Sequence, residues 1–498
     1  MKNARILALL AAMLLAAAAF TGCGGRPAGP DASSSPVSAP DASQSDRSDP
    51  VSVTDPEPTG ETPTSATGSA AATGSKTPAK TDAVTRPSAG TTGAPLEITV
   101  TGDRIDAKDM VLPDKTFKNK KIVVLTHGGE FQNIEKVVQK YGFQIEYVRV
   151  VNTEKNAKLQ KMVSTNTSPD LFASVFFPTL VTRNYVQNLD KYIDFDSGVW
   201  SGIRPMLDNF KWNDKHYYVD LKYAVDGMIW YNKDIFEEYG KTDPWTLYKK
   251  GEWTWDAYTK LAKELTVDAN KDGTPEQWGC ATMAMELVNA TTGKGFVSYT
   301  KNGLANNNLL SKEIARAIEF NMSLVRNKYM PQADQQNTFA KGKVAMYWGY
   351  LWEREPFSAL IKTKSLGLAP VPMDPAAGKK YMAANSEGFF IPRGAKNPEA
   401  AATLLTCLRI VAFDRAAADA ENARLKKAGV WTDEFQTVYD EISKCENLVL
   451  DPWATFGLGD YFGDFYTRAQ TESWSKIAAE ISPKVDATIA KVYSTNKK

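Results

Sequence analysis

No aromatic residue occurs between Phe20 and Phe117, and this gap separates the part of the chain that can fold from the part that cannot. From Gly24 to about Pro95 the sequence is mainly Ser, Thr, Pro, Ala, Gly and Asp. Such a segment cannot bury enough apolar surface to offset the entropy lost on ordering it. We therefore predict a disordered linker over residues 23–95 and a folded body from about Phe117 onward.

The segment that precedes the linker has the pattern of an export signal. Lys2 and Arg5 stand before an apolar run that is short for a membrane span and that ends at Phe20. Because Cys23 directly follows a glycine, residues 1–22 resemble a bacterial lipoprotein signal peptide, although that family usually has leucine where this chain has Phe20. Cys23 would then carry the lipid. The alternative is an ordinary signal peptide. Both predict an exported protein, and the first predicts a lipid anchor on the outer face of the cytoplasmic membrane.

The charge balance offers no argument for nucleic acid as a partner. The chain has 59 basic and 58 acidic residues, so its net charge of +1 does not attract a polyanion. Besides Cys23, the mature chain keeps Cys280, Cys407 and Cys445, and an odd number of cysteines does not make a disulfide framework. We expect buried free thiols, with one bridge between Cys407 and Cys445 as the alternative.

The body begins with alternating strands and helices. Apolar runs predict strands at 121–126, 143–150 and 169–173, and amphipathic segments predict helices at 131–141 and 152–164. This alternation implies an α/β fold with a mostly parallel sheet that helices cover on both faces. Ligands of such sheets bind where the strands end at their carboxyl termini. In this chain those loops are His127–Glu130 and Ser174–Phe177.

A series of short motifs carries a more specific resemblance. Asp226-Gly-Met-Ile-Trp230 leads into Tyr231-Asn-Lys-Asp-Ile-Phe236, and Trp253-Thr-Trp-Asp256 opens a helix with Thr254 as a plausible N-cap. Further motifs follow in the same order as in a known family: Asp268–Gly273, Phe339–Met346, Ser386–Pro392 and Asn397–Ala400. In this order and spacing they resemble the carbohydrate-binding family (family 1) of extracellular solute-binding proteins of ABC importers. The resemblance covers essentially the whole body.

The resemblance implies a two-lobe, periplasmic-binding-protein-like fold of type II. Two α/β lobes face each other across a cleft, and the chain crosses between them about three times. We expect these hinge crossings near Asp226, Gly388 and Asp451. The expected lobes are 117–225 with 388–448 for lobe 1, and 226–387 with 449–498 for lobe 2.

The resemblance also implies a set of ligand-binding residues. A sugar presents an apolar ring face and a rim of hydroxyls, so its site needs flat aromatic rings together with polar groups that donate and accept hydrogen bonds. Strand alternation would send Trp348, Tyr350 and Trp352 to one side. The alternatives are core packing for the tryptophans, and surface ion pairs for the acids. The candidates are His127, Glu130, Ser174, Phe177, Asp226, Trp348, Tyr350, Trp352 and Trp453.

The implied function is capture rather than catalysis. Such a protein, expected to be a monomer without cofactor, binds a sugar or oligosaccharide by hinge closure and delivers it to the permease subunits of an ABC transporter. Asp268, Asn270 and Asp272 imitate the start of a calcium loop, but Gly279 stands where its last ligand should be, and we predict no metal site.

Two rival functions stay open. An exported glycoside hydrolase would also need aromatic rings and carboxylates, yet the body has only two histidines and no Gly-x-Ser-x-Gly, His-Glu-x-x-His or P-loop motif. A surface sensor or adhesin would share the fold and differ only in its partner.

Overall fold

The computed structural model describes residues 98–99 and 105–494, apart from 176, 223, 283–284, 301–303 and 387. The expected signal peptide, Cys23 and the linker lie outside these residues. Within the described part, no helix is both long enough and apolar enough to cross a bilayer. Cys280, Cys407 and Cys445 are free thiols, as predicted, although Cys445 is only half-buried.

One lobe is built on a four-stranded sheet with the order β15-β4-β2-β3. Its first three strands in sequence run parallel, and β15 joins β4 in the antiparallel direction. The predicted strands and helices at the start of the body are all present, with boundaries shifted by a few residues. The elements are β2 (Lys121–Thr126), α2 (Glu135–Tyr141), β3 (Gln144–Arg149), α3 (Lys155–Ser164), β4 (Leu171–Ser174), α4 (Thr179–Thr182), α5 (Arg204–Leu207), β5 (Lys211–Trp212), β6 (Lys215–His216), β15 (Gly388–Phe390) and α13 (Pro398–Ala412).

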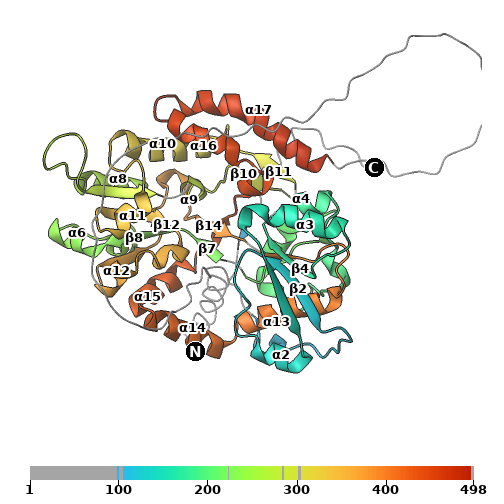
Figure 1. Ribbon diagram of the computed structural model, residues 1–498. Helices are drawn as coiled ribbons and strands as arrows, with labels where there is room; N and C mark the ends of the chain where they lie inside the picture. Colours follow the sequence, from blue (N-terminus) through green and yellow to red (C-terminus); the bar gives the residue numbers. More distant parts are fainter. Residues whose placement is uncertain are drawn as a thin grey trace, which may run out of the picture. The chain divides into compact units, whose positions relative to one another are not determined.

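The other lobe is built on a second sheet with the order β13-β8-β12-β9. Every residue of β8 and of β12 is buried, because helices cover both faces of these central strands (Figure 1). The strands of this sheet are β8 (Met228–Asn232), β9 (Trp278–Thr282), β12 (Val344–Gly349) and β13 (Leu366–Ala369). The lobe also contains β10 (Val297–Tyr299) and β11 (Ala305–Asn307), which form a separate two-stranded sheet. Its helices are α6 (Lys233–Glu238), α7 (Pro244–Lys249), α8 (Trp255–Glu264), α9 (Met285–Ala290), α10 (Lys312–Arg326), α11 (Gln335–Ala340) and α12 (Ser358–Lys362).

A small third sheet joins the two lobes. It has the order β1-β16-β14-β7 and consists of β1 (Ile98–Thr99), β7 (Ala224–Asp226), β14 (Met382–Asn385) and β16 (Asn447–Val449). The strand β7 leads directly into β8 of one lobe, and β14 leads directly into β15 of the other. We call it the crossing sheet, because the chain passes between the lobes along its strands.

The folded body begins earlier than expected. Ile98 pairs with Leu448 in the crossing sheet, and Ile105 is buried. The segment that follows is held to the first lobe, since the hydroxyl of Tyr141 donates to the carbonyl of Pro113 at 2.5 Å. The expected start at Phe117 is therefore about twenty residues too late, because the first strand contains only two residues and gives no periodic signal.

The helices near the C-terminus divide between the lobes. In Figure 1, α13 lies beside α2, whereas α15 (Asp433–Ile442) lies beside α12. Phe435 of α15 packs edge to face on Trp230 of β8, with ring centroids 5.7 Å apart. This packing does not fit the expected lobe 1 segment 388–448, and we place α15 with lobe 2 instead. The remaining helices are α14 (Arg415–Lys427), α16 (Gly459–Arg468) and α17 (Trp474–Tyr493).

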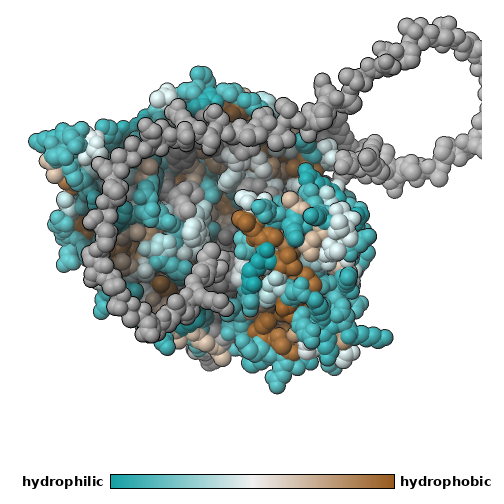
Figure 2. Space-filling view, in the orientation of Figure 1, coloured by the Kyte–Doolittle hydropathy of each residue, from teal (hydrophilic) through white to brown (hydrophobic). Residues whose placement is uncertain are grey.

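The visible surface is mostly hydrophilic. Figure 2 shows the hydrophobic residues in this view gathered mainly on the lobe that carries β2. Val111 and Val151 are among the exposed large hydrophobic side chains of the described residues, with 68% and 64% of their surface accessible. Single exposed hydrophobic side chains such as these two are normal for a folded protein.

Candidate functional site

Three carboxyl groups come together where the strands of the crossing sheet end. Asp226 is the last residue of β7, Asp451 follows β16 by two residues, and Glu286 lies in the first turn of α9. Ala383 of β14 pairs with Asp226 on one side and with Val449 on the other, so the crossing sheet brings the first two acids to the same end.

The charge of Glu286 affects the ionisation of both aspartates. Burial, together with the nearby charges of Glu286 and Glu353, raises the pKa of Asp226 to about 7. Burial and the charge of Glu286 raise the pKa of Asp451 to about 7 as well. The pKa of Glu286 is raised by burial, while its hydrogen bond from Tyr350 acts in the opposite direction. The site therefore holds both protonated and ionised carboxyl groups near neutral pH.

Backbone groups orient Asp451. Its carboxylate accepts hydrogen bonds from the backbone N–H of Phe296 at 2.5 Å, Val297 at 3.0 Å and Trp453 at 3.2 Å. Gly295 allows this close approach, because a Cβ atom there would lie 2.5 Å from the Asp451 carboxyl carbon. The sequence therefore holds this acid in one orientation by contacts from lobe 2.

Two aromatic rings lie next to the acids. Tyr350 and Trp352 stack with their ring centroids 5.6 Å apart and their planes 17° apart. The Tyr350 hydroxyl donates to Glu286 Oε1 at 2.8 Å, so the aromatic pair and the acids form one arrangement. Trp352 keeps 42% of its surface exposed and can offer a ring face to a ligand.

A buried glutamate holds the aromatic pair in place. Glu353 is fully buried, and its Oε2 accepts a hydrogen bond from the backbone N–H of Tyr350 at 2.6 Å. Its Oε1 accepts from the hydroxyl of Tyr347 and from the side chain of Gln336, both at 2.6 Å. Glu353 therefore restrains the backbone of Tyr350 in the turn after β12.

Trp348 does not belong to this arrangement. It is 1% exposed and packs against Tyr258 and Phe320, with centroid distances of 5.7 and 6.3 Å. Core packing is the alternative that the sequence left open for Trp348, and the expectation that alternation sends it to one side with Tyr350 and Trp352 is wrong for a physical reason. Both faces of β12 are covered, and the strand ends at Gly349, after which the chain turns into a short 3-10 helix.

Phe177 is also a packing residue. It is fully buried and contacts Phe210 and Tyr299 edge to face, at centroid distances of 5.5 and 6.0 Å. Its carbonyl accepts a hydrogen bond from the Tyr299 hydroxyl at 2.5 Å, and Tyr299 belongs to β10 of the other lobe. Phe177 therefore joins the two lobes and has no exposed surface for a ligand.

The remaining expected residues lie at the ends of strands. His127 is half-buried after β2, with its Nδ1 3.3 Å from Lys155 Nζ, and Ser174 is buried at the end of β4. Trp453 is half-buried and opens a 3-10 helix behind Asp451. Glu130 instead points to solvent in an ion pair with Arg149 at 2.9 Å, which is the alternative that the sequence left open.

Sequence reasoning missed Glu286 as a site residue and used Asp451 only as a crossing marker. The helix that carries Glu286 has only six residues, too few for a periodic pattern. One signal was present, since an acid follows the strand β9 by a few residues, where ligands of such sheets bind.

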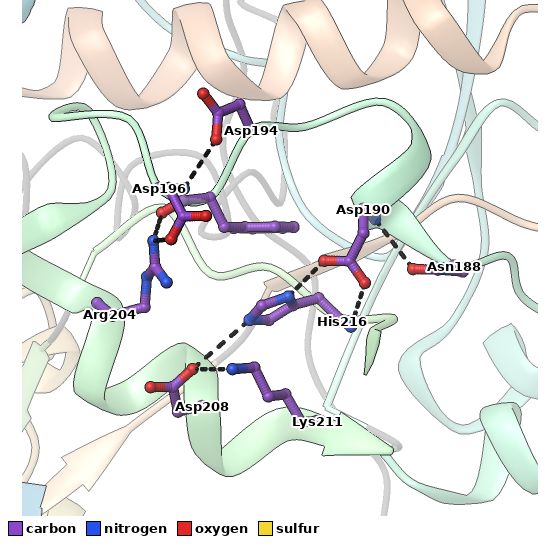
Figure 3. Close-up of polar contacts among 9 residues, drawn as sticks. Asn188, Asp190, Asp194, Asp196, Arg204, Asp208, Lys211 and His216 are labelled. Carbon is purple, nitrogen blue, oxygen red and sulfur yellow. Dashed lines mark hydrogen bonds and ion pairs between the residues drawn. The ribbon is translucent and has the colours of Figure 1, made fainter. Parts of the chain in front are cut away.

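A second polar cluster lies in the first lobe and has a structural role. Figure 3 shows His216 between Asp190 and Asp208, and its Nδ1 lies 2.6 Å from Asp190 Oδ1. The backbone N–H of His216 donates to the same carboxylate at 3.0 Å, and Lys211 pairs with Asp208 at 2.6 Å. Burial lowers the pKa of His216. These contacts fasten the β5–β6 hairpin to the loops beside it.

No cluster of acids, histidines and cysteines in the described part of the chain is arranged to hold a metal ion. The acidic turn that imitates a calcium loop uses its side chains internally. Asp268 accepts from the backbone N–H of Gly273 at 2.9 Å, and Asp272 accepts from Thr274 at 2.8 Å.

A family model of bacterial extracellular solute-binding proteins matches residues 132–410, which is more than half of the chain. None of the curated proteins matches the sequence.

Solved structures share the fold. An ABC substrate-binding protein from Listeria monocytogenes in complex with cycloalternan has 16% identity and a TM-score of 0.53, over 76% of this chain and 100% of that one. A maltose/maltodextrin-binding domain from Bdellovibrio bacteriovorus bound to maltotriose has 18% identity and a TM-score of 0.53, over 74% and 99%. An extracellular solute-binding protein from Staphylococcus aureus in complex with maltose has 15% identity and a TM-score of 0.54, over 76% of this chain and 100% of that one.

Proposed function

The chain belongs to the bacterial extracellular solute-binding proteins, and from this premise we propose that it captures a sugar or oligosaccharide outside the cytoplasmic membrane and delivers it to an ABC transporter. Members of this family bind solutes and are not enzymes, so the glycoside hydrolase is set aside. The observation that carries the proposal is the stacked Tyr350–Trp352 pair beside Asp226, Glu286 and Asp451.

This arrangement suits the chemistry of a sugar. An aromatic face packs on the apolar face of the sugar ring, while carboxyl groups accept hydrogen bonds from its hydroxyls and, when protonated, donate one. Asp226 and Asp451 have pKa values of about 7, so each can serve in either role near neutral pH. The site therefore offers both donors and acceptors without a cofactor.

Both lobes contribute to the proposed site. Tyr350, Trp352 and Glu286 come from lobe 2, and His127 with Ser174 lie at the strand ends of lobe 1. A solute held from both sides favours the closed arrangement of the lobes by its difference in affinity for the closed and open states. The closed, loaded form is the one that we propose the transporter recognises.

We further propose that a lipid on Cys23 anchors the protein to the membrane. A linker of roughly 70 residues would have a typical reach of about 45 to 50 Å. It ends at β1, which is paired with β16 in the crossing sheet. The attachment therefore leaves both lobes free to close.

A thermal-shift screen of mono- and oligosaccharides tests the proposed function, because a ligand that binds only the native state raises the melting temperature. The sugar that it returns should bind Trp352→Ala about thirtyfold or more weakly than the wild type. Trp245→Ala is the matched control, since Trp245 stacks on Tyr248 in similar geometry, at 5.5 Å and 13°, and Tyr248 contacts Lys380 and Glu441 instead of the three acids. Equal losses in both variants, or no response to any sugar, would refute the proposal.

A further inference from the structure

The three acids of the site have no basic partner. In the described part of the chain, no Lys, Arg or His lies within ion-pair distance of Asp226, Glu286 or Asp451. The groups that act on their ionisation are other carboxyls, the Tyr350 hydroxyl and backbone N–H groups. The charge of Asp226 also contributes to the raised pKa of Tyr439 in α15. Among the described residues, these acids therefore accept hydrogen bonds from backbone N–H groups and from Tyr350 but have no ion-pair partner.

A second observation comes from α9. Asn289 is completely buried, with an accessible surface of 0%. Neither its Oδ1 nor its Nδ2 has a hydrogen-bond partner. It stands three residues after Glu286, and residues at this spacing share one face of a helix. An amide left unpaired in the interior is costly, so a polar group that reaches α9 would be favoured there.

A metal ion does not fit the arrangement. The charge of Glu286 raises the pKa of both Asp226 and Asp451, but no group of acidic, histidine or cysteine side chains in the described residues converges on a single ion. A larger organic cation can meet carboxylates that lie farther apart. The neighbouring Tyr350–Trp352 stack favours such a cation too, since aromatic faces attract positive charge.

We propose that the solute carries a positively charged amino group, as an amino sugar does, and that Asp226, Glu286 and Asp451 surround this group while the sugar ring lies against Trp352. The inference rests on the proposed function and specifies its substrate class. Glu286 holds the ammonium from lobe 2, and the two aspartates hold it from the crossing sheet.

The test uses pairs of sugars that differ only in an amino group for a hydroxyl. Glucosamine, galactosamine, and the β-1,4-linked dimer and trimer of glucosamine are compared with glucose, galactose, cellobiose and cellotriose by titration calorimetry at pH 7 on the mature protein. At least one amine should bind about tenfold or more tightly than its neutral twin. The affinity for this amine should fall when the salt concentration is raised from about 0.02 M to about 0.5 M, whereas the affinity for the matching neutral sugar should not.

Charge-neutralising variants complete the test. Glu286→Gln keeps the acceptor for Tyr350 and should abolish the preference for the amine, and Asp226→Asn should do the same if the first variant does not fold. Glu434→Gln is the matched control. Glu434 lies in α15, is exposed, and pairs with Lys233 of α6 at 2.6 Å. It should leave the preference intact.

The outcomes separate the two proposals. Neutral sugars that bind as tightly as their amines, without salt dependence, would overturn the amino-group inference and leave sugar capture standing. If neither member of any pair binds, both proposals fail. A preference for the amine that survives both Glu286→Gln and Asp226→Asn would refute the assignment of these acids.

Discussion

Trp348 and Trp352 stand four residues apart and have opposite surroundings. Trp348 lies inside β12 against Tyr258 and Phe320, whereas Trp352 lies beyond the strand with 42% of its surface exposed. The difference arises because β12 ends at Gly349 and the next residues form a 3-10 helix. Alternation along a strand predicts the side of a residue only while the strand continues.

Substitution of each tryptophan should therefore affect a different property. Trp348→Ala leaves a cavity in the core and should lower the free energy of unfolding by about 3 to 5 kcal/mol. Trp352→Ala should lower it by about 1 kcal/mol or less, because little packing is lost at the surface. Urea unfolding of the ligand-free protein measures both changes. Equal destabilisation by the two variants would contradict the assignment of Trp348 to the core.

Asp226 should make the stability depend on pH. Burial raises its pKa to about 7 in the folded protein, while an unfolded aspartate titrates near 3.9. Between about pH 4 and pH 7 the folded protein therefore holds a proton that the unfolded chain has lost. This contribution to stability is fully present below about pH 4 and disappears as the pH rises through about 7.

Asp226→Asn should remove that contribution. The free energy of unfolding should fall more steeply between pH 5 and pH 8 in the wild type than in the variant. The difference between the two should be at most about 1.4 kcal/mol for each unit of pKa shift. Denaturant unfolding at the two pH values gives the comparison. Parallel pH profiles would show that Asp226 titrates normally in the folded protein.

At the scale of elements, long apolar runs were predictable and short paired segments were not. The strands at 121–126 and 144–149 and the helix between them follow from periodicity alone. The crossing sheet contains strands of only two to four residues, whose partners are between 66 and 350 residues away in the sequence. Nothing local specifies such pairs, so neither β1 nor the convergence of Asp226 with Asp451 could be predicted from their own neighbourhoods.

The strand β1 should set how far the N-terminus can be shortened. A chain that starts at Leu96 keeps the pairing of Ile98 with Leu448 and should bind solute as tightly as the mature protein. A chain that starts at Arg104 loses that strand and should be less stable by about 1 kcal/mol, the scale of a cross-strand pair or two. Melting temperatures and affinities of the two chains decide this. An unchanged melting temperature for the shorter chain would show that β1 contributes nothing.

At the scale of the whole molecule, the resemblance in the sequence supplied the two-lobe fold, and local patterns alone would have given only the first lobe. The motifs after Asp226 predict how the chain is divided, yet α15 packs on lobe 2 because Phe435 fills a space beside Trp230. Such packing depends on tertiary contacts that no motif encodes. Of the candidate site residues, Asp226, Tyr350 and Trp352 lie near one another, whereas Trp348 and Phe177 are buried, and ligand contact by any of them stays a prediction.

The proposed anchor gives a prediction about the location of the protein. Cys23→Ser should release the protein from the membrane fraction or leave it unprocessed, because no other feature of the proposal holds it there. The body should stay folded, as judged by its melting temperature. Wild-type protein found in the soluble fraction with an N-terminus beyond Cys23 would exclude a lipid at this position.

A crystal structure of the chain from Leu96 onward with the best-binding sugar of the screen tests the central claim most directly. We predict that the sugar ring lies against Trp352 or Tyr350 and that its polar groups contact at least one of Asp226, Glu286 and Asp451. The same sugar should also reach the strand ends of lobe 1. A sugar held by one lobe alone, away from the aromatic pair and all three acids, would contradict the proposed site.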